Sequence, residues 1–148
     1  SASAGVARRW ALGAAIAVYL QIVLGAVVRH TDVGLACTDL PLCKGALWLF
    51  GADPRVQLHM AHRVGALVVA GVVIAAAAQT LRVGAKDAFS RFLACALGGL
   101  VFVQIGLGLL SIHSALEVVT VTAHLGAGAL LWGGAVALWR RQPVAAAA

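Results

Sequence analysis

Charged residues are scarce in this chain. They make up 11% of its 148 residues, against 62% hydrophobic residues, and the mean hydropathy is +0.98. A soluble domain of this size cannot bury so much apolar surface, so the composition excludes that class. Four stretches, 10–28, 56–78, 92–112 and 118–139, contain one formal charge, Arg63, and each has close to the ~20 residues that cross a hydrocarbon core. Because lipid offers backbone groups no partner, residues 1–148 are predicted to form a single all-α integral membrane domain, a four-helix transmembrane bundle.

Acidic residues are scarcer still: five stand against eleven basic ones, for a net charge of +6. Seven basic residues lie before the first span, between the second and third, or after the fourth, and only three lie in the 29–55 loop. This is the positive-inside pattern. It predicts a multi-pass protein of the plasma membrane, with both termini cytoplasmic and the 29–55 loop exoplasmic. It also argues against a nucleic-acid partner.

The sequence contains an internal repeat. Residues 18–25 (VYLQIVLG), followed by His30, match residues 101–108 (VFVQIGLG), followed by His113, at a constant offset. Residues 61–67 likewise resemble residues 123–130, which have one residue more. Repeats constrain a whole fold, and these predict a bundle built from two repeated helical hairpins. Their natural relation is a pseudo-twofold axis along the membrane normal.

Two histidines lie at matching depths inside the predicted spans, where ionisable residues are costly and usually functional. His62 and His124 each stand six residues into a span, ~9 Å below its start, and small residues follow both. A twofold axis between the hairpins would bring the imidazoles face to face, as in bis-histidine ligation of a heme iron. The alternatives are hydrogen bonding between helices and a zinc site, for which no cysteine or carboxylate cluster lies at that depth.

Other polar residues near these histidines are secondary candidates. Arg63 is predicted to bind a heme propionate or to extend to the membrane surface. His59 shares a helix face with His62 and lies closer to the surface. His30 and His113 form a second repeat-related pair, which would ligate another heme, bind propionates or remain solvated. Glu117 shares a face with His124 and would reach the same pocket.

Cysteine is also rare, with three in the chain, and no Cys-x-x-Cys motif is present. Cys37 and Cys43 lie in the predicted exoplasmic loop, where disulfides persist, and Pro41 and Gly45 favour the turns that bring the sulfurs together. We therefore expect a Cys37–Cys43 disulfide, structural or redox-active. Cys95 is expected to be a small packing residue inside the third span. The segment 46–51 is expected to lie on the membrane surface.

The 25–45 stretch, GAVVRHTDVGLACTDLPLCKG, resembles the heme A synthase family. That family has the pattern Gly-Ala-Leu-Val-Arg-x-Thr-Gly-Ser-Gly-Leu-x-Cys-Pro-Asp-Trp-Pro-Leu-Cys-x-Gly, then Glu-x-x-His-Arg at the start of the second span and a ligand histidine followed by Leu in the fourth. This chain has His59-Met-Ala-His62-Arg63 and His124-Leu125 at the corresponding places. The resemblance covers nearly the whole chain, but His59 replaces the family glutamate. Asp32, Val33, Thr38 and Leu40 also depart from the loop pattern.

The resemblance implies a function. It makes His62 and His124 axial ligands of a prosthetic heme B and Cys37 and Cys43 the exoplasmic pair. It implies oxidation of the C8 methyl group of heme O to the formyl group of heme A, for terminal oxidase assembly. His59 and Glu117 are the candidate catalytic side chains. Heme O synthase or a terminal oxidase is a candidate partner.

Family members usually contain two such four-helix halves, so a homo-oligomer is expected here. Because the family glutamate is absent, a b-type cytochrome that carries electrons or heme without modifying it is an alternative. A quinone-linked thiol-disulfide oxidoreductase is a weaker one, since the chain lacks Cys-x-x-Cys.

Overall fold

The described part of the chain folds into four long helices. The computed structural model describes residues 2–40, 42–46, 53–83 and 87–143. The helices are α1 (Ala2–His30), α2 (Pro54–Arg82), α3 (Ala88–His113) and α4 (Val118–Arg141). All four are long and apolar enough to cross a membrane, and the described residues form no strand beyond one isolated bridge between Cys43 and Ala46. The predicted all-α membrane bundle is confirmed. The expected surface segment at residues 46–51 lies, apart from Ala46, outside the described residues.

The helices extend beyond the apolar stretches that predicted them. α1 begins eight residues before Trp10, and α2 continues past residue 78 to Arg82. Hydropathy marks only the part of a helix that is in hydrocarbon, whereas backbone hydrogen bonding continues into the interfacial layer until a stop signal. Polar and basic residues such as Arg8 therefore belong to the helices and not to the connections.

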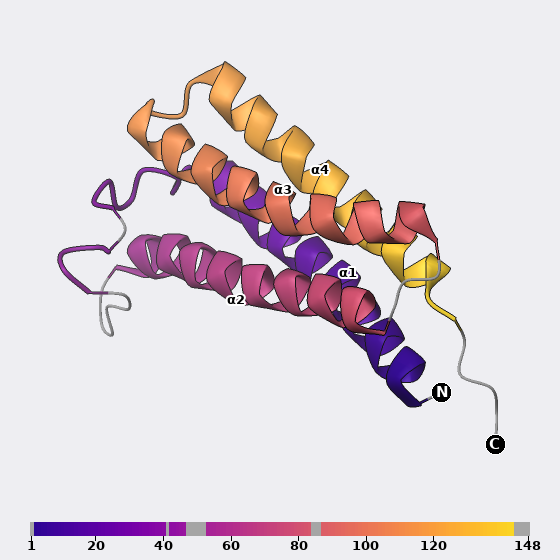
Figure 1. Cartoon of the computed structure of the whole chain (residues 1–148). Helices are drawn as coiled ribbons and strands as arrows, with labels where there is room; N and C mark the ends of the chain where they lie inside the picture. The colour runs from indigo at the N-terminus through magenta and orange to yellow at the C-terminus, as the bar shows by residue number, and fades with distance from the viewer. Residues whose placement is uncertain (1, 41, 47–52, 84–86, 144–148) are drawn as a thin grey trace.

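The helices form an antiparallel ring in which each contacts two neighbours. α1 packs against α2 and α4, and α3 packs against the same two helices. α1 and α3 run in one direction and α2 and α4 in the other, so the bundle consists of two hairpins with the same direction (Figure 1). We call the end with the 31–53 loop and the α3–α4 turn the loop end, and the opposite end, where α1 begins and α4 finishes, the terminal end.

Two aspartates fix the starts of α2 and α3. Asp53 accepts a hydrogen bond from the Arg55 amide (2.8 Å), and Pro54 follows it directly, as is typical of a first helical position. Asp87 accepts from the Ser90 amide (2.8 Å) and from Arg141 at the end of α4 (3.0 Å). The hydrogen bonds from Ser90, with a smaller contribution from the Arg141 guanidinium, hold the pKa of the Asp87 carboxyl below its ordinary value. These contacts tie the second hairpin together at the terminal end.

Small side chains form the core. Alanines from α1, α2 and α4 pack with valines and leucines from all four helices, so the backbones approach closely where the alanines lie, as is usual between transmembrane helices. The core extends from Ala11 to Val18 along α1 and from Val69 to Ala76 along α2, which is the half of the bundle toward the terminal end.

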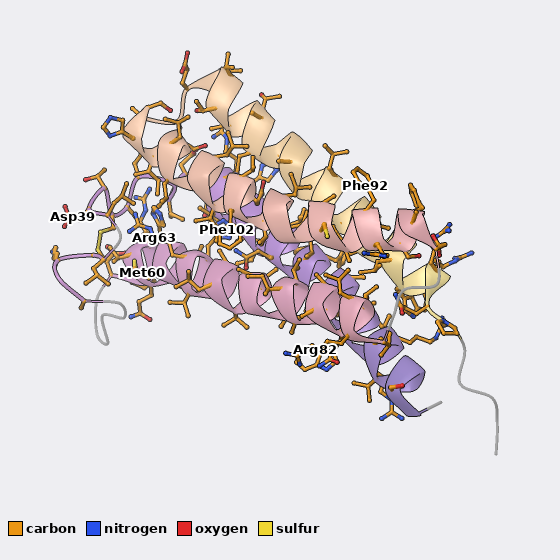
Figure 2. All side chains as sticks on the ribbon, viewed as in Figure 1. Asp39, Met60, Arg63, Arg82, Phe92 and Phe102 are labelled. Carbon is orange, nitrogen blue, oxygen red and sulfur yellow. A yellow bond between two sulfur atoms is a disulfide. The ribbon has the colours of Figure 1, made fainter. Side chains whose placement is uncertain are left out.

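Large apolar side chains cover the outside. Phe92 and Phe102, which are 66% and 64% exposed, point outward from α3 where lipid would surround it (Figure 2). Cys95 is also exposed, so the prediction that it packs inside is wrong. Small size and apolar character do not identify the side of a helix on which a residue lies, because both the lipid side and the interior accept it.

Candidate heme site

His62 and His124 each lie against a glycine of the preceding helix in their own hairpin. A Cβ atom on Gly25 of α1 would stand 2.9 Å from Cε1 of His62, and one on Gly108 of α3 would stand 3.1 Å from Cε1 of His124. Both distances are shorter than ordinary carbon contacts, so each imidazole occupies the space that the glycine leaves free. The two hairpins thus repeat one arrangement, and the predicted duplication has a direct structural counterpart.

The histidines lie about two helical turns nearer the loop end than the packed core does. On every helix, the nearest residue of the main buried cluster is seven positions, or ~10 Å, from the site residue of that helix. The pairs are Val18 and Gly25, Val69 and His62, Val101 and Gly108, and Leu131 and His124. The two imidazoles and the two glycines therefore lie at one level of the bundle, outside this cluster.

The ring of His62 is held by Gln21 of α1. The Gln21 amide nitrogen is 3.0 Å from Nδ1 of His62 and donates to the His62 backbone carbonyl at 2.8 Å. Gln21 itself packs against Gly65, where a Cβ atom would stand 2.5 Å from Oε1. Nε2 of His62 therefore has no hydrogen bond among the described residues, and it is the ring nitrogen left for an external ligand.

His124 is held differently. Its Nδ1 lies 3.1 Å from the backbone carbonyl of Gln104, the repeat equivalent of Gln21. The Gln104 side chain turns toward Gly128, where a Cβ atom would stand 3.0 Å from Nε2, and its buried Oε1 has no hydrogen-bond partner among the described residues. A carbonyl only accepts, so Nδ1 of His124 donates and Nε2 keeps its lone pair, which is the usual state of a metal-ligating histidine.

His59 and Arg63 fasten the long loop to α2. Nδ1 of His59 donates to the Val33 carbonyl (3.0 Å), and Nε2 accepts from Nε of Arg63 (3.1 Å). The Arg63 guanidinium also donates to the carbonyls of Asp39 (2.7 Å) and Cys37 (2.5 Å). Figure 2 shows Arg63 and Asp39 together at the loop end. His59 lies three residues nearer than His62 to the start of α2 at the loop end, and it is 3% exposed because the loop covers it.

The predicted disulfide is present. Cys37 and Cys43 are bonded, with Cα atoms 5.9 Å apart. Both residues are buried and form a small cluster with Met60 of α2, next to Val56. Burial of the sulfurs favours a structural bond, because thiol exchange needs access to one of them. The loop also reaches the second hairpin, since Gly34 approaches Leu116 of the α3–α4 turn.

The remaining candidates lie at the loop end and away from the two imidazoles. His30 and His113 are the last residues of α1 and α3, and both are exposed, as the solvated interpretation expects. Glu117 is the N-cap residue of α4, but its exposed side chain makes no capping hydrogen bond. The predicted roles of these three residues in binding or catalysis stay predictions.

The donor set suits a heme. Axial ligation needs two neutral imidazoles with accessible nitrogens and small neighbours, and both are present at this level. Oε1 of Gln104 is a further buried polar group, and the part of the chain that the structure describes supplies no partner for it. Within the described ranges, no group of three or more His, Cys, Asp or Glu side chains comes together as a bare metal ion would require.

Sequence reasoning missed Gln21 as the partner of His62. The sequence marks Gln21 only as part of the repeat, although it precedes Gly25 by one helical turn and so shares its face. That spacing, repeated in Gln104 and Gly108, was the available signal. The carbonyl partners of His59 and Arg63 left no signal, because any residue type supplies a backbone carbonyl.

Comparisons with known proteins identify the family of this chain. The family model described as "Cytochrome oxidase assembly protein" (COX15-CtaA) matches residues 2–136. The chain is 35% identical to a heme A synthase of Caulobacter sp. over 92% of its own length and 43% of the relative, and 35% identical to one of Symbiobacterium thermophilum over 82% and 39%. It is also 33% identical to a protoheme IX farnesyltransferase of Haloarcula marismortui, over 82% of this chain and 26% of that protein. The chain thus spans about two fifths of the length of the heme A synthases it matches.

Proposed function

Because the chain belongs to the family of cytochrome oxidase assembly proteins that includes the heme A synthases, we propose that it binds heme between His62 and His124 and oxidises heme O to heme A. The observation that carries the proposal is the repeated pairing of an imidazole with a glycine, which gives one ligand from each hairpin at the same level. Heme, when bound, supplies redox chemistry that no side chain of the protein provides.

The protein's own residues orient and enclose the site. Gln21 and the Gln104 carbonyl fix the two imidazole rings, and the glycines let the rings lie close to α1 and α3. Arg63, one residue after His62, links the ligand helix to the disulfide loop, which covers the loop end. Arg63 is also the cation nearest to His62 in the sequence, and it remains our candidate for a propionate partner.

The substrate and the neighbours of this reaction follow from the same proposal. Heme O is a farnesylated heme, and similarity to a protein named protoheme IX farnesyltransferase supports a place directly after the farnesylation step. We propose that the bundle lies in the plasma membrane with its loop end exoplasmic, from the distribution of basic residues. We also propose that copies of the chain associate, so that two four-helix units form the complete enzyme.

Pigment analysis tests the function. The chain is produced in cells that make heme O but lack their own heme A synthase, and extracted hemes are separated by chromatography. We expect hydroxylated and formylated heme from the natural chain and neither from His62→Ala or His124→Ala. A folded natural chain that accumulates heme O and forms no oxidised product would contradict the proposal.

His59 supports a second candidate function. Both its ring nitrogens are engaged, with Val33 and Arg63, so this residue has no free group to act on a substrate. A chain without a reactive group at this position would bind and pass on heme, or electrons, as a b-type cytochrome. The variant His59→Glu separates the two functions. If the natural chain is inactive and His59→Glu forms heme A, the natural chain is a cytochrome; if the natural chain forms heme A, that candidate is excluded.

A further inference from the structure

The two hairpins use equivalent glutamines in different ways. Resting on the heme site proposed above, we infer that Gln21 is a positioning residue that makes His62 the exchangeable heme ligand and leaves His124 as the permanent one. Gln21 contacts His62 through its side chain, whereas Gln104 contacts His124 through its backbone carbonyl. The repeat is therefore symmetric in residue type and asymmetric in hydrogen bonding.

The direction of the Gln21 hydrogen bonds follows from its partners. The amide atom that lies 2.8 Å from the His62 carbonyl must be the nitrogen, because a carbonyl oxygen only accepts. The same nitrogen lies 3.0 Å from Nδ1 of His62, so Nδ1 accepts as well. A neutral imidazole that accepts at Nδ1 carries its proton on Nε2.

The environment of Gln21 favours this orientation of the amide. Oε1 points at Gly65, and a Cβ atom on that residue would stand only 2.5 Å from the oxygen. The oxygen therefore fits against α2 only because residue 65 is a glycine. If the amide turned over, its oxygen would face the His62 carbonyl and two acceptors would lie side by side. The turned amide is thus disfavoured on the α2 side by repulsion between the two oxygens.

His124 has the opposite tautomer. Its Nδ1 donates to the Gln104 carbonyl, which leaves the Nε2 lone pair free for a metal. Nothing has to move before His124 coordinates through Nε2. His62 can coordinate through Nε2 only after its proton has moved to Nδ1 and Gln21 has turned its oxygen toward that proton. A backbone hydrogen bond is lost in that change, so coordination by His62 is the weaker of the two.

Nitrogen NMR of the heme-free protein tests the hydrogen bonding directly. The chain is labelled with ¹⁵N-histidine and studied in micelles. The signals that disappear in His62→Ala and in His124→Ala identify these two residues among the five histidines of the chain. We expect His62 protonated on Nε2 and His124 on Nδ1. In Gln21→Leu the Nε2-protonated population of His62 should fall, while the matched control Gln104→Leu, which keeps its backbone carbonyl, should leave both signals unchanged. His62 protonated on Nδ1 in the natural chain would overturn the inference.

Ligand exchange in the heme-loaded protein provides the second readout. Carbon monoxide binds reduced heme only where an axial ligand leaves, so its affinity reports how easily His62 is displaced. Gln21→Leu removes a hydrogen bond that opposes coordination by His62, so His62 should bind the iron more tightly and be harder to displace. One hydrogen bond corresponds to about a fivefold change in an equilibrium constant, so this variant should bind carbon monoxide about fivefold more weakly than the natural chain. Gln21→Glu offers Nδ1–H of His62 an acceptor, so this variant should also bind carbon monoxide more weakly than the natural chain. Equal carbon monoxide affinities in all variants would refute the inference. If no variant binds heme, the proposed function fails, and the NMR result still decides the hydrogen bonding.

Discussion

Replacing Gly25 by alanine should weaken heme binding by displacing the His62 ring. The new methyl group would stand 2.9 Å from Cε1 of His62, whereas ordinary contact begins near 3.4 Å. The ring or the helix must therefore move by about half an ångström, which is the tolerance within which a functional side chain has to be held. Overpacking of this kind costs about 1–3 kcal/mol. If the cost falls on the heme-bound state, the affinity drops about 5- to 150-fold.

Other glycines provide the controls. Gly13 lies on the same helix, and an added Cβ there meets nothing within 4 Å, so Gly13→Ala should bind heme like the natural chain. Gly108→Ala is intermediate, because its methyl group would stand 3.1 Å from the His124 ring. Alanine also favours the helix over glycine by ~1 kcal/mol, so Gly13→Ala should not unfold more easily, and the same gain offsets part of the overpacking cost in the other two variants.

The assay is a titration of purified heme-free protein with heme, followed by its absorbance, together with thermal unfolding of each variant. The expected order of affinity loss is Gly25→Ala, then Gly108→Ala, then Gly13→Ala with none. Equal affinities for all three, or a larger loss at Gly13, would refute the placement of His62 against α1.

Three further changes test the contacts that hold the bundle and its loop. Replacing Cys37 and Cys43 together by serine should lower the free energy of unfolding by about 2 kcal/mol, because the crosslink no longer restricts the unfolded loop; an unchanged melting temperature would contradict this. Arg63→Lys should make the loop more sensitive to protease, since a lysine cannot donate to two carbonyls with a planar fork; a loop that resists cleavage as well as before would contradict it. The pKa of Asp87 is lowered in the folded protein, so its carboxylate stabilises the fold above the ordinary pKa of 3.8 and this contribution is lost as the pH falls below that value. Between neutral and acid pH, the free energy of unfolding of Asp87→Asn should therefore fall less than that of the natural chain. If the free energy of unfolding depends on pH in the same way in both proteins, the effect is excluded.

The membrane bundle could be predicted from the sequence because its signals are local and strong. Four long apolar stretches, a charge asymmetry and a repeated Gln-Gly-His pattern all indicate the same two-hairpin architecture. The disulfide followed from two cysteines six residues apart in one loop. The outward position of Cys95 and the covered position of His59 could not be predicted in the same way, because both depend on the rotation of a helix and on the path of a loop.

The difference between Gln21 and Gln104 was equally hidden. The two residues are identical and occupy the same place in the repeat, and only their neighbours decide whether a side chain or a carbonyl reaches the histidine. The Gln21 amide packs against Gly65, which follows His62 by three residues. The Gln104 amide packs against Gly128, which follows His124 by four residues. One additional residue between histidine and glycine in α4 accompanies this difference.

The seven-residue separation between the main buried cluster and the two histidines means that the packing of this cluster involves neither proposed ligand. We therefore expect the four helices to stay associated when no heme is bound, because the contacts of the cluster do not depend on a ligand. A heme-free bundle of this kind would accept porphyrins with other metals or other side groups after purification. The same frame would then serve to compare different tetrapyrroles at one site.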